Sequence, residues 1–174
     1  LDCGCGPGSI TLGIAEAVYP GNTVGIDFGE SQIAHAKAAV SGTSRGNVSF
    51  QAATCYSLPF PADTFDRVFS HALFEHLSEP ARAVAEMRRV LKPNGIAGLC
   101  SPDWGGFILS PPSDALTQAV SSYRALQTRN GGDVEAGRKL GANLMAAGFE
   151  VIRMSARYEC YPILGFIGEY LALQ

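Results

Sequence analysis

The chain has 174 residues, of which 47% are hydrophobic and 17% are charged, and its formal net charge is −3. This length and apolar content fit one globular domain with a buried core, which we place at residues 1–174. The slightly acidic charge offers no basic surface for nucleic acid, and no apolar run is long enough to span a membrane. Because the five cysteines are scattered and the three histidines dispersed, we expect reduced thiols in a cytoplasmic protein and no metal site.

Short apolar runs alternate with segments of helical periodicity, which is typical of an α/β fold with a mostly parallel central sheet flanked by helices. In chain order, strands are predicted at residues 1–3, 23–27, 48–52, 66–71, 96–101 and 150–158. Helices are predicted at residues 9–18, 30–40, 80–91, 113–128, 133–148 and 163–173. Segment 54–64 contains Pro59 and Pro61 and is predicted to be a loop. Because the first strand begins abruptly at Leu1, we expect a fragment with a truncated first strand.

A glycine cluster follows the first predicted strand and opens the first predicted helix. Its spacing is Gly4-x-Gly6-x-Gly8. Glycines at such a junction permit unusual backbone angles and let a ligand approach the main chain closely. The dinucleotide fingerprint requires a third glycine at position 9, where this chain has Ser9. The loop therefore predicts binding of an adenosyl or dinucleotide cofactor, with a tight packing turn as the alternative.

The second predicted strand ends in Asp27, nineteen residues past Gly8. A carboxylate at this point accepts hydrogen bonds from ribose hydroxyls in nucleoside-binding folds. The alternative is a cap for the helix that begins near Glu30. The next residue, Phe28, is placed either against an adenine face or in the core.

Five separated segments resemble the motifs of class I S-adenosylmethionine-dependent methyltransferases, in the order of that family. They are residues 1–8, Val24-Gly25-Ile26-Asp27, Leu58-Pro59-Phe60-Pro61 with Phe65-Asp66, Phe74-Glu75-His76-Leu77 and Arg89-Val90-Leu91-Lys92-Pro93-Asn94-Gly95. The resemblance is to the small-molecule branch that includes the ubiquinone/menaquinone C-methyltransferases, and it covers the chain to about residue 101. It implies a Rossmann-like methyltransferase fold whose last strand is missing here.

The resemblance also implies S-adenosylmethionine as cofactor and S-adenosylhomocysteine as product. The cofactor-binding residues that it implies are Asp2, Gly4, Cys5, Gly6, Gly8, Asp27, Phe28, Gln32, Thr54, Cys55, Ser70 and His71. Thr54 departs from the family, which usually has an acid there to contact the adenine amino group. The Thr54 hydroxyl can accept the same bond, more weakly by about 1 kcal/mol, and the Cys55 amide can reach the ring.

Methyl transfer from a sulfonium neutralises charge, so catalysis can come mainly from aligning the acceptor with the methyl group. A general base is needed only when the acceptor arrives protonated. His71 ends the fourth predicted strand and is the candidate base, with a place in the pocket wall or a helix cap as the alternative. Asp103 and Trp104 follow the fifth strand and are candidate substrate contacts; Trp104 either stacks on an aromatic acceptor or is a lid over the core.

Two other functions stay open at this point. An NAD(P)-binding oxidoreductase also begins with a strand, a glycine loop and an acid-ended strand, but it leaves residues 58–60 and 89–95 unexplained. A non-catalytic cofactor-binding domain is favoured only by Thr54 and by the truncated ends. The sequence leaves the identity of the small-molecule acceptor and the oligomeric state open.

Overall fold

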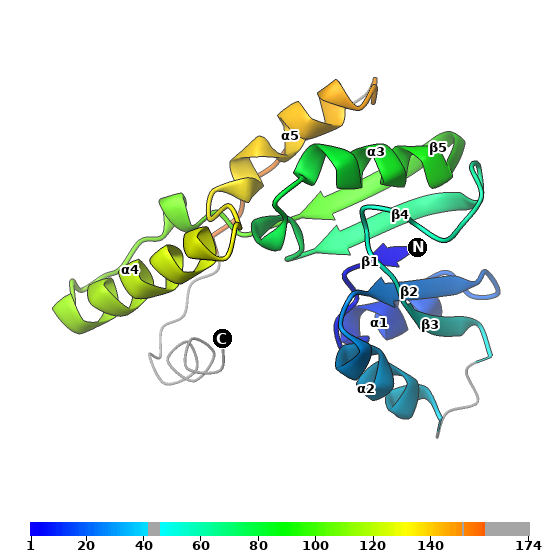
Figure 1. Ribbon diagram of the computed structural model, residues 1–174, viewed down its shortest axis with the longest axis horizontal. Coiled ribbons are helices and arrows are strands. Elements are labelled where there is room, and N and C mark those ends of the chain that lie inside the picture. Colours follow the sequence, from blue (N-terminus) through cyan, green and yellow to red (C-terminus); the bar gives the residue numbers. More distant parts are fainter. Residues whose placement is uncertain (42–45, 151, 159–174) are drawn as a thin grey trace.

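A five-stranded parallel sheet forms the centre of the computed structural model, which describes residues 1–41, 46–150 and 152–158 (Figure 1). The strand order is β3-β2-β1-β4-β5. The bounds are β1 Asp2–Cys3, β2 Thr23–Asp27, β3 Val48–Ala52, β4 Phe65–His71 and β5 Leu91–Cys100. The α/β class is therefore confirmed, and all the strand pairs of this sheet are parallel.

Helices cover the sheet on both faces. The helices are α1 Ser9–Ala17, α2 Glu30–Val40, α3 Pro80–Val90, α4 Asp114–Arg129 and α5 Ala136–Ala146, with short 3-10 turns η1 Phe74–His76 and η2 Trp104–Gly106. Because successive strand residues point to opposite faces, Phe50 packs with Ile33 and Ala36 of α2, while Ile26 packs with the α3 residues. The strand segments are short runs of apolar residues because both faces of a parallel sheet are covered by helices.

The junction of α3 and β5 differs from the prediction. The helix ends at Val90, one residue early, and β5 begins at Leu91 rather than at residue 96. The ladder jumps from Phe65↔Leu91 to Arg67↔Ile96, so the predicted stop signal at residues 92–95 loops out within the strand. Asn94 adopts a φ of 63° there, which is the left-handed conformation that asparagine tolerates.

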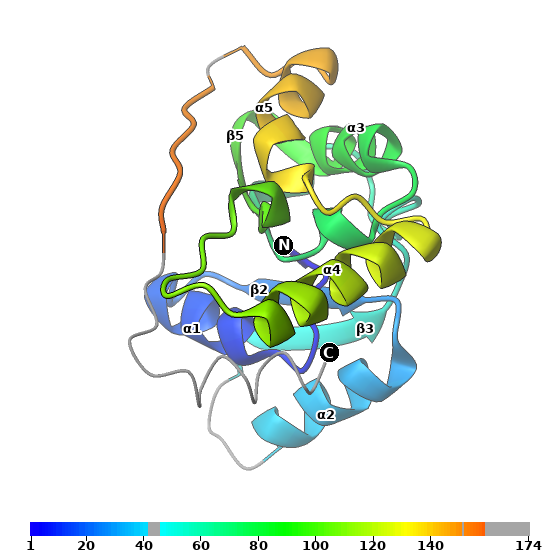
Figure 2. The ribbon, with the colours of Figure 1, turned by 90° about the vertical axis from the view of Figure 1, so that its left-hand side faces the viewer.

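Residues 104–146, which we call the cap, contain η2, α4 and α5. Figure 2 shows α4 lying across the end of the sheet toward which the strands point. Ser113 caps α4 by accepting from the Leu116 amide, so α4 is shifted by one residue from the prediction. The predicted cap Asp133 accepts instead from the Glu135 amide, and α5 runs only from residue 136 to 146.

The predicted strand at residues 150–158 is wrong. Glu150 lies in a bend, and residues 152–158 have no regular structure although the segment leaves α5 as an extended trace (Figure 2). An extended segment becomes a strand only when its backbone groups pair with a neighbour, and no ladder in the described residues includes this one. The helix predicted at residues 163–173 lies outside the described residues. Within the described ranges, no helix combines the length and apolarity needed to cross a bilayer.

Candidate functional site

The carboxyl ends of four strands meet at one edge of the sheet. Asp27 pairs with Ala52 across β2 and β3, and Thr54 follows two residues later. Asp2 of β1 pairs with Phe69 of β4, so His71 lies two residues beyond that pair. In open α/β sheets, ligands bind outside the carboxyl ends of the strands. The predicted site residues of the glycine loop, Asp27, Thr54 and His71 are therefore brought to this edge.

The glycine loop is tied directly to the end of β2. The amides of Gly4 and Cys5 both donate to the Ile26 carbonyl, at 2.8 and 2.9 Å. Gly4, Gly6 and Gly8 have φ values of 74°, 51° and 87°, in the left-handed region that L side chains rarely adopt. Gly8 immediately precedes α1 and is its N-cap residue. The predicted turn between strand and helix is thus confirmed as a backbone conformation that favours glycine.

The three glycines have different surroundings. A Cβ at Gly8 would lie 2.8 Å from Phe50 and 3.0 Å from Ala36, so this glycine lets α1, α2 and β3 pack together. A Cβ at Gly4 would lie 3.0 Å from Leu73. At Gly6, nothing lies within 4 Å of the Cβ position. Gly6 therefore leaves open space beside the main chain, as close approach of a ligand requires.

Both carboxylate oxygens of Asp27 accept backbone hydrogen bonds. Oδ2 accepts from the Gly6 amide at 2.9 Å, and Oδ1 accepts from the Gly29 amide at 2.8 Å at the start of α2. Asp27 therefore supports the start of α2 through the amide of its N-cap residue Gly29, although Asp27 is not the cap residue itself. A carboxylate has about four lone-pair sites, so each Asp27 oxygen keeps capacity for a further donor such as a ribose hydroxyl.

Two side chains flank Asp27 at the beginning of α2. Phe28 is 84% exposed, which places it outside the core and at the open edge. Gln32 is exposed as well, and its Cγ lies 3.2 Å from the Cβ position of Gly29. Both side chains are accessible to a ligand that reaches Asp27.

The loop after β3 is shaped by its own hydrogen bonds and by α3. The Thr54 hydroxyl accepts from the Tyr56 amide at 3.2 Å, which uses one of its two lone pairs. Tyr56 is held in turn by Arg82, which donates to its carbonyl and lies 5.5 Å from its ring centroid. The Cys55 side chain is buried in the main core cluster, so only its backbone faces the edge as a ligand contact.

Arg89 and Glu86 of α3 anchor the Leu58-Pro59-Phe60 segment. Arg89 donates to the Leu58 and Phe60 carbonyls at 3.0 and 2.8 Å, and Glu86 accepts from the Leu58 amide at 2.8 Å. Arg89 also pairs with Glu86 at 2.7 Å, and this hydrogen bond holds the pKa of Glu86 below its usual range. Two distant motifs of the sequence analysis are therefore halves of one clamp, which sequence spacing alone did not reveal.

The remaining candidate cofactor-binding residues differ in how deeply their side chains are buried. Asp2 is 2% exposed and accepts from the Thr11 hydroxyl at 2.6 Å, and desolvation raises its pKa. Ser70 is completely buried on the opposite face of β4 from His71, and its hydroxyl has no partner among the described residues. Cys5 is buried too, with its pKa raised to about 12 by desolvation, so its thiol is a packing group. His71 is exposed at the end of β4.

Asp103 directly precedes the cap and Trp104 is its first residue, and other side chains hold both of them. The Asp103 carboxylate pairs with both Nε and Nη2 of Arg138 at 2.6 and 2.8 Å, which lowers the pKa of Asp103. The Trp104 indole donates to Glu75 at 2.9 Å, and its ring centroid lies 4.6 Å from that of Tyr123. The sequence analysis did not identify Glu75, although the Phe74–Leu77 segment that carries it was singled out.

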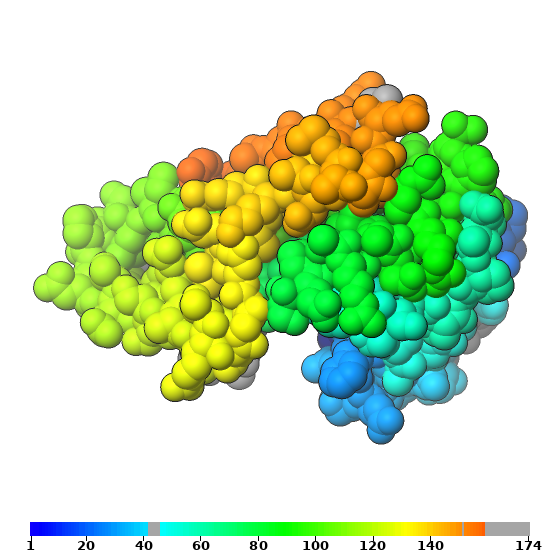
Figure 3. Space-filling view, turned by 45° about the horizontal axis from the view of Figure 1, so that its top comes forward, coloured from blue at the N-terminus to red at the C-terminus, as the bar shows by residue number. Residues whose placement is uncertain are grey.

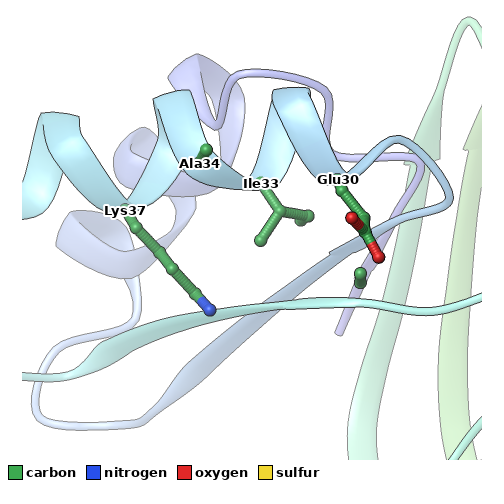
Figure 4. Close-up of a pocket in the computed structure, with 5 residues that line it drawn as sticks. Glu30, Ile33, Ala34 and Lys37 are labelled. Carbon is green, nitrogen blue, oxygen red and sulfur yellow. The ribbon is translucent and has the colours of Figure 1, made fainter.

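The candidate site is an open edge. Figure 3 shows an indentation between the yellow α4 end of the cap and the blue residues near the start of α2. A hollow of about 280 Å³ lies farther out, between α2 and the edge strand β3 (Figure 4). Its lining includes Glu30, Lys37 and Ala52 but no predicted site residue. A second hollow, of about 570 Å³, lies along α4 beside Arg124 and Arg129 and is likewise separate from the predicted residues.

Comparison with known proteins shows which family has this arrangement. A family model described as a methyltransferase domain matches residues 1–99, which is more than half of the 174-residue chain. The chain belongs to this methyltransferase family. The match spans β1 to β5 and includes the glycine loop, Asp27 and the Arg89 clamp, so the resemblance stated from the motifs is confirmed.

Relatives extend the comparison beyond the matched segment. The ubiquinone/menaquinone biosynthesis C-methyltransferase of Geobacter sulfurreducens is 36% identical over 129 residues, covering 73% of this chain and 48% of that protein. A solved S-adenosylmethionine-dependent methyltransferase from Aquifex aeolicus shares the fold with a TM-score of 0.67 at 24% identity, covering 87% of this chain and 72% of its own. The [4+2]-cyclase SpnF also has a TM-score of 0.67, at 28% identity over 87% of this chain and 52% of its own. This methyltransferase domain spans less than half the length of the first curated relatives, between 37% and 48%.

Proposed function

We propose that this methyltransferase domain transfers a methyl group from S-adenosylmethionine to a small-molecule acceptor. The observation that carries the proposal is the open Cβ position of Gly6 beside the Asp27 carboxylate. Because Gly6 has no side chain, the cofactor could approach the main chain directly at this position. The name of the Geobacter relative supports a quinone-like acceptor.

The residues present fit the cofactor at several points. The two Asp27 oxygens retain capacity to accept from ribose hydroxyls, and the exposed Phe28 ring offers a face for adenine. Thr54 keeps a lone pair for the adenine amino group. The amides of Gly4, Cys5 and Gly6 already donate within the protein, so we assign carbonyl groups of the left-handed loop to the methionine portion. When bound, S-adenosylmethionine supplies an electrophilic methyl group on a positively charged sulfur.

The chain's own residues then have to orient the acceptor and take up its proton. His71 is exposed at the same edge as the glycine loop, and we assign it the role of base for an acceptor that arrives protonated. The yellow end of α4 forms the opposite side of the indentation (Figure 3), and we assign Trp104 of the cap to the acceptor. The free thiols of four described cysteines support the further proposal of a reducing, cytoplasmic location.

The first experiment measures ligand binding by isothermal titration calorimetry. We expect the native chain to bind S-adenosylhomocysteine and not NADH, because Ser9 replaces the glycine that close approach of a diphosphate requires. Binding of NADH alone would overturn the proposal in favour of an oxidoreductase. Incubation with methyl-tritiated S-adenosylmethionine and a small-molecule extract then separates a transferase, which labels an acceptor, from a non-catalytic binding domain.

Asp27→Ala provides the matched site variant for this titration. We expect a loss of about 1.5–3 kcal/mol in binding S-adenosylhomocysteine, as for a hydrogen bond to a charged group. The variant also removes the acceptors of the Gly6 and Gly29 amides, so its stability has to be measured alongside. A folded variant with native affinity would restrict Asp27 to the capping role.

A further inference from the structure

Glu75 is a buried carboxylate that the proposed transfer does not use. It lies in η1, directly between β4 and α3, and is 3% exposed. Burial of a charged or polar group costs free energy unless hydrogen bonds compensate for the lost water. Its partners in the structure are the indole of Trp104 at 2.9 Å and His76, whose Nε2 lies 3.7 Å away.

The η1 turn contacts the cap at three separate points. Besides the Trp104 bond to η2, the Glu75 carbonyl accepts from the Asp133 amide at 2.9 Å, just before α5. The His76 Nδ1 lies 3.2 Å from Oε1 of Gln127 in α4. Gln127 in turn donates to the Tyr123 hydroxyl at 3.0 Å, and the Tyr123 ring packs on Trp104. These contacts form a closed circuit from η1 through η2 and α4 back to η1.

The approach of the cap to η1 is close enough to demand a glycine. A side chain at Gly132 would overlap the Glu75 carbonyl oxygen. Gly132 therefore lets the loop between α4 and α5 rest directly on the Glu75 backbone. The same short segment, residues 71–76, carries the candidate base His71 and the contacts that place the cap.

We propose that Glu75 is a positioning residue that holds Trp104, and with it η2 and α4, in place at the acceptor side of the edge. The Glu75 carboxylate accepts from the indole N–H, and the Glu75 backbone carbonyl holds the loop before α5 by accepting from the Asp133 amide. The relation to the acceptor rests on the proposed methyl transfer. The holding of Trp104 and of the cap does not, so the two can be tested separately.

Trp104 is the single tryptophan of the chain, so intrinsic tryptophan fluorescence reports on this position alone. In Glu75→Ala we expect a red shift of the emission and loss of the protection of Trp104 from acrylamide quenching. Glu75→Gln retains an oxygen that accepts from the indole, and we expect it to restore that protection. Gly132→Ala, which disturbs the same contact from the cap side, should resemble Glu75→Ala. The matched control is Glu79→Ala, because Glu79 is 56% exposed and pairs with Arg82 outside the cap.

Hydrogen exchange distinguishes positioning of the cap from general stability. In Glu75→Ala, amides of α4 and α5 should exchange faster while those of β2 and β4 keep their native protection. Unchanged quenching of Trp104, or equal loss of protection in the strands, would overturn the proposal. S-adenosylhomocysteine should bind Glu75→Ala with native affinity, since the polar partners of Glu75 are Trp104, His76 and Asp133 and lie outside the glycine loop. Failure of the native chain to bind it would overturn the proposed function and leave the fluorescence and exchange tests intact.

Discussion

Gly6 and Gly8 are two residues apart and have the same handedness, but the structure gives them different tasks. Because Gly8 has no side chain, Phe50, Ala36 and the start of α1 can pack together. Because Gly6 has no side chain, the space next to Asp27 stays open. One glycine is therefore explained by packing and the other by access to the main chain. A motif that lists both as equivalent positions hides this difference.

Alanine substitutions separate the two tasks. Gly8→Ala should lower the free energy of unfolding by about 1–3 kcal/mol, because its Cβ overpacks against Phe50 and Ala36. Gly6→Ala should lower the free energy of unfolding by about 1 kcal/mol, because its φ is positive. For the same loss of stability, Gly6→Ala should weaken S-adenosylhomocysteine binding more than Gly8→Ala does. Urea unfolding and calorimetry measure the two effects.

Gly13→Ala is the control for both variants. Gly13 lies inside α1 with nothing within 4 Å of its Cβ position, so alanine should stabilise the helix by about 1 kcal/mol. Equal effects of the Gly6 and Gly8 substitutions on stability and binding would contradict the division of tasks.

The loop between β3 and β4 illustrates how one element is placed by another. Its two prolines prevent regular helix, and its main-chain groups at Leu58 and Phe60 are satisfied by side chains of α3. Since Thr54 begins this loop, α3 indirectly holds a candidate cofactor contact. The clamp also joins two of the motifs that characterise the family.

Arg89→Leu should detach this loop. The substitution removes hydrogen bonds to two carbonyls and leaves Glu86 without its partner, so we expect a loss of about 1–3 kcal/mol in the free energy of unfolding. Arg88→Leu is the control on the same helix, because Arg88 lies over the Phe149 ring and should cost at most about 1 kcal/mol. Similar losses in the two variants, measured by urea unfolding, would argue against the clamp.

At the scale of the whole molecule, α5 packs Ala136 and Leu140 into the apolar core, whereas polar contacts hold η2 and the loop before α5. Asp103 pairs with Arg138, Asp133 pairs with Lys139, and Trp104 donates to Glu75. The first two ion pairs hold the pKa values of Asp103 and Asp133 below the ordinary value. The sheet is held by the apolar core on the α3 face. The parts of the cap that depend on these ion pairs should therefore respond to pH before the sheet does.

Acid should loosen the cap. A carboxyl whose native pKa is depressed contributes stability above its unfolded value, about 3.9, and loses it as the pH falls toward the native value. Asp2 has the opposite sign, since desolvation raises its pKa and its contribution is lost as the pH rises. We expect the Trp104 emission to shift below about pH 4, and Asp103→Asn to reduce this pH dependence while shifting the emission at neutral pH. A native profile in Asp103→Asn would show that this ion pair does not hold the cap.

The sequence predicted the first half of the chain closely because local signals and packing agree there. Gly4, Gly6 and Gly8, the acid at Asp27 and the alternating apolar runs each favour the conformation that the sheet requires. The segment that follows the cap was predicted less well. Extended residues 152–158 carry strand-like composition but no ladder partner, and such pairing depends on a neighbour that propensity does not see.

The amino-acid pattern alone therefore established the βα order, the glycine loop, Asp27 and the methyltransferase family, since all of these depend on neighbours in sequence or on motifs at fixed spacing. Only the tertiary structure distinguished Gly6 from Gly8, joined Arg89 to the Leu58 loop and brought Glu75 into hydrogen-bond contact with Trp104. Those relations depend on contacts between residues from 21 to 42 positions apart, and such contacts exist only once the strands and helices have packed.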